Sequence, residues 1–442
     1  MPDHARSADP AVQFQIDRLM ALGPGADVLG LDRITRLLAR LGDPQQALPP
    51  VIHVAGTNGK GSTCAFLRAA LEAAGKTVHV YTSPHLVRFN ERIRVAGRLI
   101  GDAELAALLA EVLDAGADIG ASFFEVTTAV AFLAFTRTRA DACIIEVGLG
   151  GRLDATNVIP APAATAIAQL GIDHQAFLGD TAEAIAREKA GIAKLGVPLI
   201  TMAYPPTVAE AVAAVAGAAG APLFPRGSDW SFRVESGELC YRDAKGTLVT
   251  PLPALAGPHQ PANLALAIAT LRHQTRIAVP DAAFAAAARE ARWPARMQRL
   301  ARGPLHALLP PGSELWLDGG HNPAAADAVA DTIERVAHGR PVHLVLGMLA
   351  NKDVEGLLAP FAPFIASLTA VPVPGHAHHG PAELVETAHR LGITSTAAAS
   401  EVATALRMLV GRSNAGEPPV VLVLGSLYLA GAVLEANDEL PD

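Results

Sequence analysis

A glycine-rich loop near the start of the chain has residue types that can bind phosphate. Residues 53–63 read HVAGTNGKGST. The usual phosphate-binding loop has a glycine five residues before its Gly-Lys pair and a Ser or Thr directly after the lysine. Here Val54 stands at the first position, and Gly61 separates Lys60 from Ser62. The stretch is either a nucleotide site of another subtype or a glycine-rich turn with a surface lysine.

The types of side chain in this loop suit a magnesium-bound triphosphate. Glycines let the backbone come close to phosphate oxygens, and the first N–H groups of a following helix attract anions. Lys60 offers a positive charge to the β- and γ-phosphates, and Ser62 or Thr63 offers a hydroxyl to Mg²⁺. The loop follows an apolar strand-like run and opens a helix-like segment, which favours the nucleotide interpretation.

Glu146 stands at the end of another apolar run, CIIEVGLGG. A buried carboxylate is costly unless it is paired, so Glu146 requires a partner. That partner is either a Mg²⁺ ion at the carboxyl edge of a sheet, where ligands of open α/β sheets gather, or a basic side chain such as Arg152.

Two further runs end in polar residues of the same kind. Asp173 and His174 follow the run 164–170, and Ser83 and His85 follow the run 78–82. A single histidine is more often structural than a metal ligand. The convergence of four strand ends on one edge of a sheet is more informative than any one motif.

Short apolar runs alternate with helical patterns, which predicts an α/β fold with a doubly wound, mostly parallel sheet. The expected strands are 51–55, 78–82, 142–148, 164–170 and 197–203. The expected helices are 61–75, 102–115, 125–138, 181–194, 207–219 and 261–275. Residues 221–255 contain short runs of mixed apolar and polar residues, such as FRVES, ELCYRD and GTLVTPL, which predict a small antiparallel insertion or flanking sheet.

A polar, Pro-punctuated stretch at 291–304 predicts a linker, and we expect a domain boundary near residue 299. The expected domains are therefore 1–298 and 299–442, the second a smaller Rossmann-like α/β domain. Its expected strands are 314–318, 342–349, 367–373 and 418–426. Its expected helices are 323–337, 353–359, 381–391 and 400–411.

Composition limits the class of protein. The 442 residues suffice for two or three domains, half are apolar, and the formal net charge is −8, so no global attraction to nucleic acid or anionic membrane is expected. The cysteines Cys64, Cys143 and Cys240 lack metal-site spacing, and we expect buried free thiols. No signal peptide or membrane-spanning run is expected, which favours a cytoplasmic protein.

Taken together, the motifs resemble one family over about residues 25–430. They are AGTNGKGS, TSPHLVRFNERI, EVGLGGRLDATN, GIDHQAFLGDTAEAIAREKAGI, GPHQPAN, WPARMQ, LDGGHNP and GMLANKD, in that order. This order is similar to folylpolyglutamate synthase/dihydrofolate synthase, a branch of the Mur-type ATP-dependent amide ligases. The resemblance implies an ATPase domain, a second Rossmann-like domain, and addition of L-glutamate to dihydropteroate or reduced folates. The glycine between Lys60 and Ser62 is expected in that family.

The resemblance also implies a mechanism that elementary chemistry supports. A carboxylate is a poor acyl donor, and γ-phosphoryl transfer from ATP converts it into an acyl phosphate. The amino group of glutamate then attacks the acyl carbon and phosphate leaves, while Mg²⁺ and cationic side chains offset phosphoryl charge.

Residue roles carry over position by position. The ATP phosphates would be held by Thr57, Asn58, Gly59, Lys60, Gly61 and Ser62. The implied magnesium ligands are Ser62, Ser83, Glu146 and His174. Lys189 matches a lysine that family members carry as a carbamate, and the resemblance favours that role. Taken alone, the sequence favours a pair with Glu188 or Glu183 on a helix surface.

Other matches would contact ATP or the second substrates. Asn263 resembles the adenine contact, and Arg296 and Asp318 resemble groups that reach ATP. His321 is a candidate near the phosphates or the incoming glutamate. Without the family, Arg296 is a solvated linker charge, and Asp318 and His321 cap the helix that begins near Pro323.

The pteroate side of the match rests on four segments. Its residues are Leu29, Gly30, Ser83, Pro84, Phe124, Leu153, Asp154 and Ala155. Phe124 would stack on the pterin, although a buried core position beside Phe123 explains it equally well. Asp154 would hydrogen-bond the pterin edge or orient its own loop.

Three positions depart from the family pattern: Gly320, Asn351 and Ala295 stand where Ala, Asp and Gly are common. None removes a proposed ligand, so we expect an active enzyme. The alternatives are a Mur-type ligase for a cell-wall peptide precursor and a non-catalytic ATP-binding regulator. The expected partners are small molecules, with no nucleic acid and no membrane, and we expect a monomer.

Overall fold

In a computed structural model, residues 5–22, 29–410 and 417–442 are described. The chain divides into two compact units. The first contains the chain up to Ala254 together with Gln260–Arg292, and the second contains Leu255–His259 and Trp293–Pro441. Each unit is built around its own sheet. In the described residues no helix combines the length and apolarity that crossing a bilayer requires.

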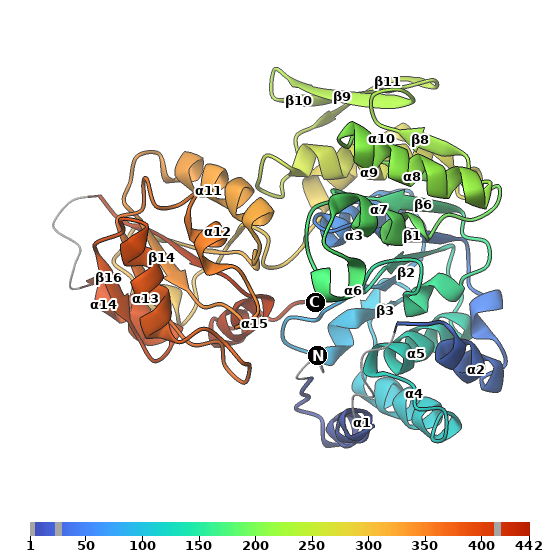
Figure 1. The fold of residues 1–442 in the computed structure, drawn as a ribbon, viewed down its shortest axis with the longest axis horizontal. Coiled ribbons are helices and arrows are strands. Elements are labelled where there is room, and N and C mark those ends of the chain that lie inside the picture. Colours follow the sequence, from blue (N-terminus) through green and yellow to red (C-terminus); the bar gives the residue numbers. More distant parts are fainter. Residues whose placement is uncertain (1–4, 23–28, 411–416) are drawn as a thin grey trace. The chain divides into compact units, whose positions relative to one another are not determined.

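The first unit has an eight-stranded, mostly parallel sheet in the order β4-β3-β2-β5-β1-β6-β7-β8 (Figure 1). Its strands are β1 Val51–Ala55, β2 Val78–Tyr81, β3 Ile93–Val95, β4 Arg98–Leu99, β5 Ala142–Glu146, β6 Ala164–Ile167, β7 Leu199–Thr201 and β8 Leu223–Pro225. β3 pairs antiparallel with β2 and β4, and the other neighbours are parallel. The continuous apolar runs become strands that are buried on both faces, which confirms the predicted fold class.

Helices cover both faces of this sheet. They are α1 Pro10–Ala21, α2 Asp32–Arg40, α3 Lys60–Ala73, α4 Asp102–Ala115, α5 Phe123–Arg137, α6 Gln175–Leu178, α7 Ala182–Ala190, α8 Pro206–Ala219, α9 Gln260–His273 and α10 Asp281–Glu290. One core joins α1, α2, α4 and α5 to the strands, and another joins α7 and α8 to them. α3 packs against α9 and α10.

The predicted antiparallel insertion is a three-stranded sheet. It consists of β9 Trp230–Glu235, β10 Glu238–Asp243 and β11 Gly246–Pro251, with β10 in the middle. This sheet lies beside α9 and α10 (Figure 1). Trp230 and Tyr241 are buried on it and stack with ring centroids 6.1 Å apart.

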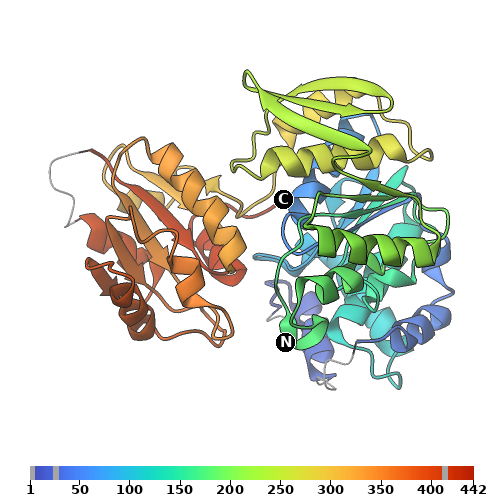
Figure 2. The ribbon, with the colours of Figure 1, turned by 45° about the horizontal axis from the view of Figure 1, so that its top comes forward.

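The second unit has a six-stranded sheet, ordered β12-β13-β17-β14-β15-β16, with helices packed around it (Figure 2). Its strands are β12 Gln298–Arg299, β13 Glu314–Leu317, β14 Val342–Leu346, β15 Ser367–Ala370, β16 Thr396–Ala398 and β17 Val420–Leu424. Its helices are α11 Pro323–Ala337, α12 Val354–Leu358, α13 Pro381–Arg390, α14 Val402–Val410 and α15 Leu427–Ala436. All strand pairs are parallel except β12 with β13.

Several details differ from the sequence-based expectations. The long segment of the second unit starts at Trp293, and Leu255–His259 also belong to this unit, whereas the sequence predicts a boundary near residue 299. Gln298 and Arg299 pair with β13 and so already belong to the second sheet. The functional assignment of the two units stays a prediction. The pattern extended several strands past their ends. The elements that it missed include α1, α2, α6, α10, α15, β3, β4 and β16. Cys240 is half-buried, whereas Cys64 and Cys143 are buried as expected.

Candidate active site

The glycine-rich loop connects β1 to α3 and is anchored by the segment after β6. The N–H groups of Thr57 and Asn58 both donate to the carbonyl of Gln169, at 2.8 and 3.1 Å. Gly56 has φ +148°, and a Cβ there would lie 2.9 Å from the Cβ of Ala168. Only glycine fits so close to a neighbouring strand. The loop conformation is therefore set by β6 as much as by the loop itself.

The start of α3 is suited to an anion. Gly59 precedes the helix with φ +84°, and among the described residues no side chain caps it. The first N–H groups of a helix have no partner within it, and the helix dipole makes this end positive. Lys60 is half-buried, and its Nζ donates to the carbonyls of Gly56 and Thr57, at 3.2 and 3.4 Å. The lysine thus lies folded over the loop, which argues against a lysine extended into solvent.

Only one of the two candidate hydroxyls remains suited to a cation. Thr63 is fully buried and donates its hydroxyl to the carbonyl of Gly59, at 2.8 Å. Ser62 lies at the helix start, and its Oγ accepts from Nε2 of Gln260 at 3.4 Å. Gln260 in turn accepts from Nδ2 of Asn263, at 3.2 Å.

This pair on α9 touches the phosphate loop directly. A Cβ on Gly59 would lie 2.5 Å from Oδ1 of Asn263. The adenine contact predicted for Asn263 therefore stays a prediction, while its contact with the loop is observed. Sequence reasoning missed Gln260, although it stands in the same motif three positions earlier, on the same side of a helix.

Glu146 is buried at the end of β5, beside the loop that follows β2. Its Oε2 accepts from the backbone N–H of Ser83, at 3.4 Å. The alternative partner is wrong, because Arg152 pairs with Glu188 at 2.9 Å. Burial raises the pKa of the Cys64 thiol, Glu146 adds to the rise and Lys60 opposes it, so both charges lie near Cys64 on α3.

This donor set fits magnesium better than a metal that needs an all-protein cage. Within the described ranges no three His, Cys, Asp or Glu side chains gather as a metal site. Mg²⁺ is usually held by one or two carboxylates together with substrate phosphates and water. The buried carboxylate of Glu146, in contact with the backbone N–H of Ser83, is a candidate ligand of this kind. Glu146, Ser62 and Ser83 are the residues that would hold the ion.

His174 stands in a strained backbone conformation before the short helix α6. Its φ is +52°, and its backbone N–H donates to Oδ1 of Asp173, at 2.9 Å. Its side chain is 44% exposed, whereas that of Asp173 is 15% exposed. The ligand role predicted for His174 stays a prediction.

Lys189 is a buried lysine on α7. It is 4% exposed, and its Nζ donates to the carbonyl of Gly56 in the phosphate loop, at 3.0 Å. Burial lowers its pKa to about 7, with a further lowering by Lys60 and opposing effects of Asp173 and Asp154.

The alternative of a surface ion pair for Lys189 is wrong. Glu188 pairs with Arg152, and Glu183 accepts from the hydroxyl of Thr207. Lys189 instead points into the interior beneath the glycine-rich loop.

The predicted pteroate segments lie on α5 and on the turn after β5. A Cβ on Gly148 would lie 2.3 Å from the ring of Phe124, so this ring rests against the turn. Tyr81 is its aromatic neighbour, with centroids 5.9 Å apart. Phe124 is half-buried, and Phe123 beside it packs edge-on against Phe89.

Asp154 orients its own loop. Its carboxylate accepts from the N–H groups of Leu149 and Thr156, at 2.8 and 3.0 Å, and caps the short helix η3 Ala155–Val158. Burial raises its pKa, and these hydrogen bonds oppose the rise. A direct contact with a pterin stays a prediction.

The remaining pteroate candidates differ in exposure. Ala155 is buried, Leu29, Gly30, Ser83 and Leu153 are half-buried, and Pro84 is exposed. A side chain at Gly30 would meet no described atom within 4 Å.

In the second unit, Asp318 holds together the turn that carries Arg296. Its carboxylate accepts from the N–H groups of Met297 and Gly320, each at 2.7 Å. A guanidinium nitrogen of Arg296 would lie 2.9 Å from a Cβ on Gly319. The expected helix caps are wrong, because Asn322 caps α11 through the N–H of Ala325, at 2.9 Å.

Two histidines belong to the surroundings of this turn. His321 lies with Nδ1 3.2 Å from the carbonyl of Gly319. Burial lowers the pKa of His259, and Asp318 and Arg296 act on it with opposite signs. Sequence reasoning missed His259, although the GPHQPAN motif contains it. Ala295 adopts φ +53°, which explains why glycine is common at this position.

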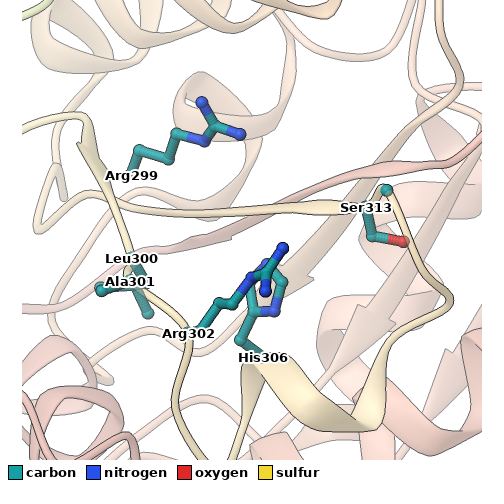
Figure 3. A pocket seen from close by; sticks show the side chains of 7 residues that line it. Arg299, Leu300, Ala301, Arg302, His306 and Ser313 are labelled. Carbon is teal, nitrogen blue, oxygen red and sulfur yellow. The ribbon is translucent and has the colours of Figure 1, made fainter.

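A cavity of about 400 Å³ in the second unit contains none of the predicted site residues (Figure 3). It is lined by Arg299, Leu300, Ala301, Arg302, His306, Gly312 and Ser313. The predicted site residues of this unit, Arg296, Asp318 and His321, therefore lie elsewhere in it.

Comparison with known proteins identifies the family. The glutamate ligase domain of Mur ligases matches residues 296–427. The chain is 36% identical over 412 residues to the dihydrofolate synthase/folylpolyglutamate synthase of Escherichia coli, covering 93% of this chain and 92% of that protein.

Two solved structures resemble the whole chain. One is E. coli FolC in complex with DHPP and ADP, with a TM-score of 0.86, 34% identity and 98% of each chain covered. The other is the bifunctional enzyme of Yersinia pestis with AMPPNP and a Mn ion, with a TM-score of 0.84, 32% identity, and 98% and 99% covered. At this identity and coverage, and with the glycine-rich loop placed between a strand and a helix, this chain belongs to the dihydrofolate synthase/folylpolyglutamate synthase family of ATP-dependent ligases.

Proposed function

We propose that this enzyme joins L-glutamate to dihydropteroate or to reduced folates through an acyl phosphate, with Mg²⁺ as the cofactor. The observation that carries the proposal is the contact between a buried lysine and the phosphate loop: Nζ of Lys189 lies 3.0 Å from the carbonyl of Gly56. A ligand complex of a relative with DHPP and ADP, and the match to a glutamate ligase domain, support the choice of substrates.

The loop residues would bind the triphosphate. The N–H groups of the first turn of α3 would donate to the phosphate oxygens, because a helix N-terminus attracts anions. Lys60 would neutralise charge on the transferred phosphoryl group. Mg²⁺, when bound, supplies Lewis-acid stabilisation of the phosphoryl oxygens. Glu146 would hold it from the end of β5, with Ser62 and Ser83 beside it.

Lys189 would act as a carbamate. A neutral amine attacks carbon dioxide, forms an N–C bond and releases one proton, which leaves a carboxylate on the side chain. A pKa of about 7 keeps a large share of the amine neutral near neutral pH. The resulting anion, directed at the phosphate loop, would orient the cation or the acyl phosphate.

The pteroate carboxylate would accept the γ-phosphoryl group and release ADP. The amino group of glutamate would then attack, lose a proton and expel phosphate. His321 is the candidate near the incoming glutamate, and Arg296 and Asp318 are candidates for ATP contacts. Pterin stacking on Phe124, a cytoplasmic location and a monomeric state stay predictions.

A product assay tests the function. The purified full chain is supplied with ATP, Mg²⁺ and L-glutamate, and receives dihydropteroate or tetrahydrofolate in separate reactions. We expect phosphate release in step with a product heavier by one glutamate residue, measured by mass spectrometry, with at least one acceptor. Phosphate release without a ligated product from either acceptor would contradict the proposal.

A further inference from the structure

His53 is a fully buried histidine in the middle of β1, the strand that leads into the phosphate loop. Side chains alternate along a strand, so His53 shares a face with Val51 and Ala55. Val51 belongs to the core formed with α5, and Ala55 to the core formed with α7 and α8. A histidine in such apolar surroundings is costly unless it has a specific partner.

That partner is Thr156, on the short helix η3. Nε2 of His53 lies 2.8 Å from the hydroxyl oxygen of Thr156. The same hydroxyl donates to Oδ1 of Asp154. A hydroxyl has one proton, so it accepts from His53, and the histidine is the neutral Nε2–H tautomer. Nδ1 of His53 is buried without a hydrogen bond in the described structure, which suits an acceptor nitrogen better than an N–H group.

We call the hydrogen-bonded series His53–Thr156–Asp154 the relay. It continues from Asp154 to the turn after β5. The other carboxylate oxygen of Asp154 accepts from the N–H of Leu149, at 2.8 Å. Leu149 follows Gly148, the residue against which the ring of Phe124 rests. A hydrogen-bonded chain therefore runs from the strand before the phosphate loop to the predicted pteroate turn.

Asn157 holds the other side of the same helix. Its Nδ2 donates to the carbonyls of Arg152 and Gly191, both at 3.0 Å. Its own carbonyl accepts from Nζ of Lys194, at 2.9 Å. η3 is thereby fixed to the end of α7, and the turn is also tied to α7 by the N–H of Arg152, which donates to the carbonyl of Glu188 at 2.8 Å. The contacts of His53, Thr156 and Asp154 add a second set of restraints on the same turn.

We propose that His53 is a positioning residue which, through the hydroxyl of Thr156, holds Asp154 and the turn 148–156 in the conformation that receives the pteroate substrate. The inference rests on the proposed function, in that this turn is the pteroate site. Neither His53 nor Thr156 is assigned contact with the substrate. The proposal therefore predicts that breaking these contacts weakens substrate binding and leaves nucleotide binding unchanged.

Two matched variants of Thr156 test the relay. Thr156→Val keeps the shape of the side chain and removes the hydroxyl, whereas Thr156→Ser keeps the hydroxyl. The Kd of dihydropteroate and the Kd of AMPPNP are measured by calorimetry on the full chain, and the KM values for dihydropteroate and ATP by phosphate release.

We expect Thr156→Val to weaken dihydropteroate binding about tenfold, which is the scale of one buried hydrogen bond, with AMPPNP binding within about twofold of wild type. Thr156→Ser should bind both ligands as the wild type does. Equal weakening of both ligands, or a Thr156→Ser variant as impaired as Thr156→Val, would overturn the inference.

A double-mutant cycle separates the relay from general packing. His53→Leu should weaken dihydropteroate binding like Thr156→Val, and the double variant no further than the weaker-binding single variant. Additive losses would refute the relay. If His53→Leu does not fold, the comparison of Thr156→Val with Thr156→Ser still tests the inference. A wild-type chain that binds dihydropteroate but ligates neither dihydropteroate nor tetrahydrofolate would reject the proposed function, while the comparison of Kd values would still test the role of His53 and Thr156.

Discussion

At the scale of single residues, burial changes the chemistry of Lys189. An exposed lysine is almost fully charged at neutral pH, whereas burial and Lys60 bring the pKa of Lys189 to about 7. Nothing in the letters EKAGI distinguishes these two cases. The reactive state of this amine is a consequence of the fold.

Replacing Lys189 tests its proposed carbamate. We expect Lys189→Ala to lower kcat by on the order of 10²-fold, and added short-chain carboxylates to restore part of it. Because the neutral amine forms the carbamate, the bicarbonate-dependent activity of the wild type should rise as pH rises through about 7. The control is Lys76→Ala, just beyond the C-terminal end of α3. Unchanged activity of Lys189→Ala without any added carboxylate would contradict the role.

His53 should make the protein sensitive to acid. Burial, with a smaller effect of Lys194, lowers its pKa from 6.5 to about 3. The unfolded chain then binds more protons than the folded one between these values, so His53 lowers the free energy of unfolding as pH falls through that window. We expect His53→Leu to lose less stability than wild type between pH 6.5 and 4, measured by urea unfolding. Identical pH slopes would contradict a neutral buried histidine.

At the scale of elements, two glycines flank α3 with similar backbone conformations and different surroundings. Gly59 has φ +84° and lies against Asn263, whereas Gly75 has φ +72° and no described atom within 4 Å of a Cβ. Alanine at either position costs about 1–2 kcal/mol of backbone strain. Only Gly59→Ala adds a clash with the side chain of Asn263.

The comparison of Gly59→Ala with Gly75→Ala therefore isolates the contact between loop and α9. We expect Gly75→Ala to lose stability with little change in nucleotide affinity. Gly59→Ala should lose at least as much stability and weaken AMPPNP binding more than tenfold, measured by thermal unfolding and calorimetry. Equal AMPPNP affinity in the two variants would show that the close approach of Asn263 does not shape the loop.

At the scale of the whole molecule, predicted nucleotide residues belong to both units. Lys60 and Asn263 are in the first, and Arg296 and Asp318 are in the second. Because these predicted ligands belong to two units, a test of the nucleotide site requires variants in both units and a measurement of their activity.

Alanine variants in both units test whether residues of both units bind the same nucleotide. We expect Lys60→Ala to abolish ligation with the fold retained, and Arg296→Ala to raise the KM for ATP severalfold. Arg292→Ala serves as the control and should leave the KM unchanged, because the Arg292 guanidinium donates to the nearby backbone carbonyls of Arg289 and Ala291. An Arg296→Ala variant with the KM of wild type would remove the second unit from the nucleotide site.

Local patterns along the chain were sufficient for the fold class, the family, and the placement of the glycine-rich loop between a strand and a helix. Continuous apolar runs identify parallel strands, and the ordered motifs are dense enough to specify one ligase branch. The loop could be recognised from the sequence because its glycines and its lysine lie next to one another in the chain. The missed helices α1 and α10 pack against α4 and α3, and this tertiary packing stabilises them.

The tertiary structure alone decided which polar groups meet across long sequence distances. It paired Arg152 with Glu188 rather than Glu146, placed Lys189 beneath Gly56, and joined His53 to Asp154 through Thr156. The physical reason is that burial and hydrogen-bond partners depend on which strand ends become neighbours. Parallel strands that adjoin in the sheet are distant in the chain, so that neighbourhood is settled only when the sheet forms.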